Sequence, residues 1–139
     1  MRVFLDANIL ISVFNKEYPV FTYSSRVLSL TDNSRFQLYT SPICLAIAFY
    51  FSEKKSGSTI AKQKIQLLSS KIGITPIDRN TVLDVFKNRS INDFEDGLEY
   101  QAAMESKCKC IITEDLNDFH FSSLEVLNAK SFLEKYAMK

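Results

Sequence analysis

The sequence predicts an α/β fold with a largely parallel β-sheet, and three observations predict it. The apolar run 3–5 is typical of a buried strand, and it is followed at once by the polar Asp6-Ala-Asn8 and by an apolar stretch typical of a helix. The segment 92–106 has an apolar residue every fourth position, as one face of a helix requires, and it leads into a buried strand at 110–113. Strand-like and helix-like segments alternate along the chain, which favours β-α-β units.

Turn and capping residues divide the chain into short elements. Ser41 followed by Pro42 is typical of a helix start, because serine caps the first turn and proline fits the first helical position. Gly73 is expected to end a helix in the left-handed conformation. Asp93 is expected to cap the helix 92–106, and Asn128 to cap the last helix. The expected strands are 3–5, 36–40, 74–77, 110–113 and 126–127, and the expected helices begin near residue 9 and cover 21–30, 42–53, 58–72, 81–86, 92–106 and the segment after Asn128.

Length and composition exclude several classes of protein. The 139 residues fit one domain spanning 1–139, and a net charge of +1 provides no overall attraction to nucleic acid. No apolar run approaches the roughly 20 residues of a membrane helix, so we expect a cytoplasmic protein that does not enter membranes. A single histidine, His120, and three cysteines without C-x-x-C spacing argue against a zinc site and against a serine or cysteine triad. Carboxylates are therefore expected to carry the chemistry.

Three aspartates have related positions in this scheme. Asp6 follows the first strand, Asp115 follows the fourth, and Asp96 lies in the first turn of the helix before the fourth strand. Right-handed crossovers place the carboxyl ends of parallel strands and the N-terminal ends of such helices at one rim, so these carboxylates are expected to lie together. Neighbouring carboxylates repel unless a cation compensates, and oxygen ligands suit Mg²⁺ or Mn²⁺. Such an ion would activate water for phosphodiester hydrolysis.

Each of these acids also has a structural explanation. Asp6 and Asn8 can accept hydrogen bonds from the first turn of a helix, and acidic residues such as Asp93 are stabilised there by the helix dipole. Glu99 is expected on the solvated face of its helix, and Asp118 is expected to form a turn. The arrangement in space therefore decides whether the acids form a site.

Four segments carry a recognisable pattern: VFLDANILI at 3–11, DFEDGLEYQAA at 93–103, CIITEDLNDF at 110–119 and the closing VLNAKSFLEKY. Together they resemble the PIN domain, in the branch of VapC-type toxins of type II toxin–antitoxin pairs. The resemblance implies a three-layer fold with a five-stranded parallel sheet of order 3-2-1-4-5 and a Mg²⁺- or Mn²⁺-dependent endoribonuclease. The residues it implies are the catalytic, metal-binding Asp6, Asp96 and Asp115, the further catalytic acid Asp118, and the supporting Asn8 and Thr113.

One position departs from this resemblance. The family's second acid lies in the helix after the second strand, where this chain has Ile47, and no carboxylate occurs between residues 42 and 52. An aliphatic side chain cannot bind a metal, so the alternative to a ribonuclease is a catalytically degenerate domain that binds RNA or protein. Glu114 would compensate only if its side chain turned to the same side as that of Asp115.

The expected partners are RNA, an antitoxin protein and a second copy of the chain. The helix from Pro42 to Phe51 is more apolar than one core face requires, which favours a homodimer. A phosphatase or phospho-acceptor domain with Asp6 as nucleophile fits less well, because such sites use a lysine after a later strand and the fourth strand here ends in Thr113-Glu114-Asp115.

Overall fold

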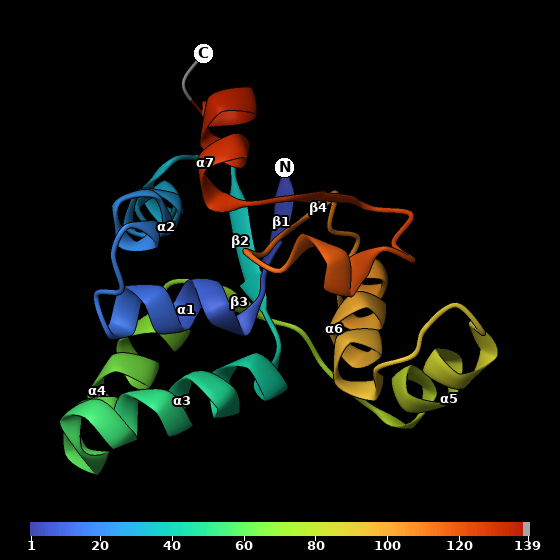
Figure 1. The fold of residues 1–139 in the computed structure, drawn as a ribbon, viewed down its shortest axis with the longest axis horizontal. Helices are drawn as coiled ribbons and strands as arrows, with labels where there is room; N and C mark the ends of the chain where they lie inside the picture. The colour runs from blue at the N-terminus through green and yellow to red at the C-terminus, as the bar shows by residue number, and fades with distance from the viewer. Residues whose placement is uncertain (138–139) are drawn as a thin grey trace.

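The structure, a computed structural model that describes residues 1–137, is a three-layer α/β fold (Figure 1). Its strands form one parallel sheet in the order β3-β2-β1-β4-β5, which confirms the predicted fold class and strand order. The strands are β1 (Arg2–Leu5), β2 (Gln37–Thr40), β3 (Gly73–Ile74), β4 (Cys110–Ile112) and β5 (Glu125–Leu127).

Helices cover both faces of the sheet. The first four contact one another in succession around α1 and α3, and α7 contacts α2, whereas α5 and α6 pack together; Figure 1 shows these two groups on opposite sides of the strands. Within residues 1–137, no helix combines the length and apolar character needed to cross a bilayer. The helices are α1 (Ala7–Phe14), α2 (Val20–Leu28), α3 (Pro42–Ser56), α4 (Ser58–Ser69), α5 (Arg79–Lys87), α6 (Phe94–Glu105) and α7 (Ala129–Phe132), the last continued by a π-helical turn over Leu133–Ala137.

The central strands β1 and β4 lie in the core, and the register of their pairing positions the residues of the site. Their side chains are fully buried from Val3 to Leu5 and from Cys110 to Ile112, because helices cover both faces. Leu5 lies beside Ile112 in the parallel ladder. The next residues of the two strands, Asp6 and Thr113, therefore emerge side by side at the carboxyl edge of the sheet.

Two expectations about the edge strand are wrong. β3 is only two residues long rather than 74–77, and it pairs only with β2. Gly73 does not end a helix, because α4 stops at Ser69 and Gly73 lies in β3 opposite Tyr39. A Cβ at Gly73 would lie 2.4 Å from Cε1 of the Tyr39 ring, so the close approach of that ring, and not a left-handed backbone, requires glycine here.

Capping residues direct three helix starts to the same edge of the sheet. Ser41 accepts a hydrogen bond from the Cys44 N–H at 3.2 Å, and Asp93 accepts one from the Asp96 N–H at 2.9 Å. Figure 1 shows the N-terminal ends of α1, α3 and α6 turned toward the carboxyl end of β1. The predicted caps at Ser41 and Asp93, and the one at Asn128, are confirmed.

Candidate metal centre

Asp6 is the most buried of the predicted site carboxylates, with 8% of its surface exposed. It accepts hydrogen bonds from the Ala7 N–H at 2.6 Å and from the Thr113 hydroxyl at 2.7 Å. Burial raises the pKa of Asp6, although the hydrogen bonds it accepts oppose that shift. Asp6 does cap α1, as the structural explanation expects. Its second oxygen faces away from that cap and into the group of residues described next.

Asn8 joins the first and the last of the predicted acids. Its amide nitrogen lies 3.2 Å from Asp6 Oδ2, 3.2 Å from Asp115 Oδ2 and 3.0 Å from Thr113 Oγ1. Two oxygens that contact one nitrogen cannot be further apart than the sum of those contacts, so Asp6 and Asp115 are neighbours in space. The Asn8 carbonyl accepts the Glu114 N–H at 3.2 Å, and Thr113 accepts the Asp115 N–H at 3.0 Å. This network fixes the carboxylates of Asp6 and Asp115, which lie more than one hundred positions apart in the sequence.

Asp96 reaches the same region from the first turn of α6. It is half-buried, and its pKa is raised to about 7 by burial first and then by the charges of Asp93, Asp118 and Asp6. Asp118 is exposed in the 3₁₀ turn Leu116–Phe119. The structure thus brings Asp6, Asp96, Asp115 and Asp118 to one edge of the sheet, where their charges repel one another.

Glu99 contradicts the expectation that it lies on a solvated face. It is 1% exposed, and its pKa is raised to about 10, by burial first and then by the charge of Asp6. The Cys44 thiol donates a hydrogen bond to Glu99 Oε1 at 2.8 Å, whereas Oε2 has no hydrogen-bond partner within the described residues. The spacing Asp96-x-x-Glu99 places the two acids on one side of α6, and that spacing is the sequence signal that points to Glu99.

Ile47 and Glu114 bring no carboxylate into the site. Ile47 is half-buried and packs against the apolar core. Glu114 Oε2 accepts the Ala129 N–H at 3.0 Å, so this side chain is directed to the start of α7. Adjacent residues on the turn point apart, and the compensation considered for Glu114 is not seen.

No basic side chain among residues 1–137 forms an ion pair with these acids. Over residues 1–137 the ion pairs are Lys87 with Asp84 and Lys135 with Glu125, both outside this region. Two carboxylates about 4 Å apart repel by roughly 4 kcal/mol near a protein surface. The acids must therefore share protons or a cation, and a set of carboxylate oxygens fits the coordination preferences of Mg²⁺ and Mn²⁺.

Comparison with known proteins identifies the family. A PIN domain family model matches residues 2–117. The chain belongs to the PIN domain family. Ribonuclease VapC1 of Aquifex aeolicus (strain VF5) is 25% identical to this chain over an alignment 142 residues long. The alignment covers 97% of this chain and 95% of that protein. Its resemblance to this PIN domain supports a nuclease.

Solved structures of the same fold agree with this assignment. VapBC2 from Rickettsia felis, bound to a DNA fragment from its promoter, aligns with a TM-score of 0.69 and 18% identity over 92% of this chain and 98% of that chain. VapBC-1 from nontypeable Haemophilus influenzae aligns with a TM-score of 0.68 and 19% identity over 94% of this chain and 99% of that chain. At these identities the likeness shows that the PIN domain described here shares their fold.

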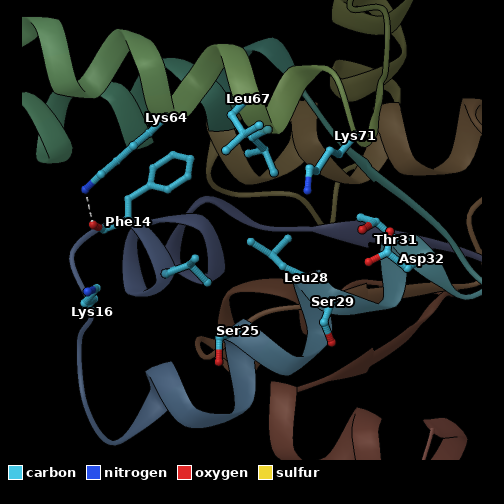
Figure 2. Close-up of a pocket in the computed structure, with 12 residues that line it drawn as sticks. Phe14, Lys16, Ser25, Leu28, Ser29, Thr31, Asp32, Lys64, Leu67 and Lys71 are labelled. Carbon is cyan, nitrogen blue, oxygen red and sulfur yellow. Dashed lines mark hydrogen bonds between the residues drawn. The ribbon is translucent and has the colours of Figure 1, made fainter.

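An apolar cavity of about 480 Å³ lies away from the acids of this PIN domain (Figure 2). It opens between α1, α2 and α4, with Phe14 and Leu28 on its walls and Leu67 across from them. Lys64 and Lys71 reach its rim from the α4 side. None of the predicted metal ligands lines it, so this cavity is separate from the acidic region.

Proposed function

We propose that this PIN domain is a divalent-metal-dependent endoribonuclease and the toxin of a toxin–antitoxin pair. The observation that carries the proposal is the convergence of Asp6, Asp96, Asp115 and Glu99 at one edge of the sheet without a basic partner among residues 1–137. The similarity to Ribonuclease VapC1 supports the nuclease class. The preference of Mg²⁺ and Mn²⁺ for oxygen ligands supports the metal.

The roles proposed for the side chains follow from their contacts. Asp6, Asp96 and Asp115 would hold the ion, which when bound polarises the phosphodiester and lowers the pKa of water. Asn8 and Thr113 keep the oxygens of Asp6 and Asp115 in place through the hydrogen bonds described above, and such supporting contacts raise metal affinity. Asp118 is assigned a supporting role beside Asp96.

RNA cleavage tests this proposal. Wild type and Asp6→Asn are incubated with a mixed RNA pool in Mg²⁺, in Mn²⁺ and in chelator, with the exposed Asp32→Asn as matched control. We expect cleavage by wild type and Asp32→Asn in either metal, none in chelator, and at least a hundredfold loss for Asp6→Asn, because the central ligand loses its charge. Cleavage by Asp6→Asn at the wild-type rate would exclude Asp6 as a ligand.

The alternative, a degenerate domain that only binds RNA or protein, is favoured by Ile47. A metal that binds the folded state alone raises the melting temperature, so titration with Mn²⁺ separates the two functions. No rise at millimolar Mn²⁺, together with no RNA cleavage, would leave the binding function as the better explanation.

An exposed aromatic pair at the start of α6 supports single-stranded RNA as the substrate. Phe86 of α5 and Phe94 of α6 stack with their ring centroids 5.4 Å apart, and 69% and 46% of their surfaces are exposed. Phe94 begins α6, two residues before Asp96, and Arg89 lines the same small hollow. Aromatic faces bind unpaired bases by stacking, and arginine binds the phosphates between them.

The cavity in Figure 2 supports an antitoxin as the protein partner. Its apolar walls would bury apolar side chains of a partner segment, and Lys16, Lys64 and Lys71 would face acidic residues flanking them. Two of the structures that share this fold, those from Rickettsia felis and Haemophilus influenzae, are VapBC complexes. A partner seated between α1, α2 and α4 would leave the acidic edge free for additional contacts.

Exposed aromatic residues on α3 support self-association of the chain as a homodimer. Tyr50 and Phe51 on α3 are 50% and 42% exposed, and their rings pack edge to face on the surface. Apolar area of this kind favours a homodimer interface. Light scattering on the purified chain tests it, and a monomer mass at high concentration would contradict the dimer.

A further inference from the structure

Glu99 carries an oxygen that the protein itself does not satisfy. The residue lies inside the molecule with 1% of its surface exposed, and Oε2 has no hydrogen-bond donor within residues 1–137. A buried carboxylate is costly unless a charge or hydrogen bonds compensate for the lost water. A buried carboxylate without a hydrogen-bond partner is therefore often part of a functional site.

The atoms around Glu99 form a compact donor set. One ligand atom each from Asp6, Cys44 and Glu99 lie within 4.8 Å of one another, close enough for a single ion to contact more than one of them. Asp6 comes from the end of β1, Cys44 from the first turn of α3 and Glu99 from the second turn of α6. If Glu99 is ionised as well, neither carboxylate can donate a hydrogen bond to the other, so the pair of Asp6 and Glu99 requires a shared proton or a cation.

We propose that Glu99 of α6 is a metal-binding carboxylate of this site. It would take the place of the acidic residue that α3 lacks, because Ile47 stands at that position. This inference rests on the metal-dependent function proposed above. Glu99 follows Asp96 by three residues, so one helix presents both carboxylates to the same ion. The total number of carboxylates is kept, although one of them comes from the opposite helical layer.

Cys44 acts as a positioning residue in this arrangement. Its thiol donates to Glu99 Oε1 at 2.8 Å, and burial together with the negative charges of Glu99 and Asp6 raises its pKa, which keeps it a thiol. The bond holds one oxygen of Glu99 and leaves Oε2 without a hydrogen-bond partner among the described residues. Because a neutral thiol is a poor ligand for hard cations, the oxygens of Asp6 and Glu99 bind the ion.

A purely structural role makes a different prediction. If Glu99 only kept a proton and donated it to Asp6, a glutamine would replace it, because the amide also donates a hydrogen bond and has nearly the same shape. Glu99→Gln preserves that contact and removes the anionic ligand. The substitution therefore separates structural support from metal binding.

Calorimetric titration of the full chain with Mn²⁺ tests the inference without relying on activity. Glu114→Gln is the matched control, because Glu114 lies next to Asp115 and directs its carboxylate to Ala129. We expect wild type and Glu114→Gln to bind Mn²⁺ alike and Glu99→Gln to bind at least tenfold more weakly. Wild-type affinity in Glu99→Gln would overturn the role of Glu99 while leaving the proposed nuclease intact. Absence of binding in wild type and Glu114→Gln would overturn the metal-dependent function and this inference together.

Two variants of Cys44 provide an independent test if Glu99→Gln does not fold. Cys44→Ser keeps a hydrogen-bond donor at this position, and Cys44→Ala removes it. We expect Mn²⁺ affinity to be retained in Cys44→Ser and to fall several-fold in Cys44→Ala, because Glu99 loses its anchor. Equal affinity in both variants would contradict the positioning of Glu99 for the ion.

Discussion

Without metal, the chain should lose stability as the pH rises, and Glu99 should contribute a large share of that loss. The pKa of Glu99 is raised from 4.5 to about 10 in the folded protein. Between these values the folded state holds a proton that the unfolded state has released, so the free energy of unfolding falls by about 1.4 kcal/mol per pH unit. The stabilisation is complete below the unfolded pKa and is lost progressively as the pH approaches the folded one.

From pH 5 to pH 7 this loss amounts to about 2.7 kcal/mol for Glu99, a large part of the stability of a small domain. Asp6 and Asp96, whose pKa values are also raised, act in the same direction. In Glu99→Gln the group that titrates is gone, and the slope of stability against pH should fall by about 1.4 kcal/mol per unit.

Urea unfolding in chelator at pH 5, 6 and 7 measures this slope for wild type, Glu99→Gln and Glu114→Gln. We expect the wild type and the Glu114→Gln control to lose stability in parallel, and the slope of Glu99→Gln to be smaller by about 1.4 kcal/mol per pH unit. A Glu99→Gln profile as steep as that of wild type would refute the assignment of the titration to this buried carboxyl group.

Four further substitutions test other parts of the structure. Asn8→Ala should lower Mn²⁺ affinity ten- to a hundredfold in calorimetry, because both carboxylates lose their shared donor; unchanged affinity would contradict that support. Phe86→Ala should raise the KM for single-stranded RNA about fivefold with little change in kcat, since one stacked base is worth roughly 1–3 kcal/mol; an unchanged KM would remove the stacking surface. Gly97→Ala should lower the free energy of unfolding by about 1–3 kcal/mol in urea, because its Cβ would lie 2.7 Å from side-chain atoms of Val85 and Ile91; wild-type stability would show that the α5–α6 contact adapts. Phe51→Glu should convert a dimer into a monomer in light scattering, and a persistent dimer would place the interface elsewhere.

The sheet and the positions of most acids were predictable because they depend on local pattern. An apolar run that stops at Asp6, and another that stops before Thr113, mark the carboxyl ends of two strands, and parallel pairing brings those ends together. Caps such as Ser41 and Asp93 were predictable for the same reason, since a cap is decided within four residues.

The burial of Glu99 was not predictable from the spacing of apolar residues. That spacing marks Phe94, Leu98 and Ala102 as the inner face of α6, yet Phe94 is 46% exposed and stacks on α5. The buried side of α6 is broader and is rotated to include Glu99, because the helix packs on α5 and α3 as well as on the apolar core. Contacts between elements that are distant in the sequence decide which side of α6 is buried, and the sequence of the helix alone does not determine it.

A crystal of the wild-type protein grown with Mn²⁺ tests most directly whether these acids form a metal centre. Anomalous scattering from manganese should give a peak in contact with carboxylate oxygens of Asp6 and Glu99 at the carboxyl end of β1, with Asp96 and Asp115 beside it. A well-diffracting crystal at millimolar Mn²⁺ with no peak there, or with peaks only at other surface carboxylates, would contradict the metal centre.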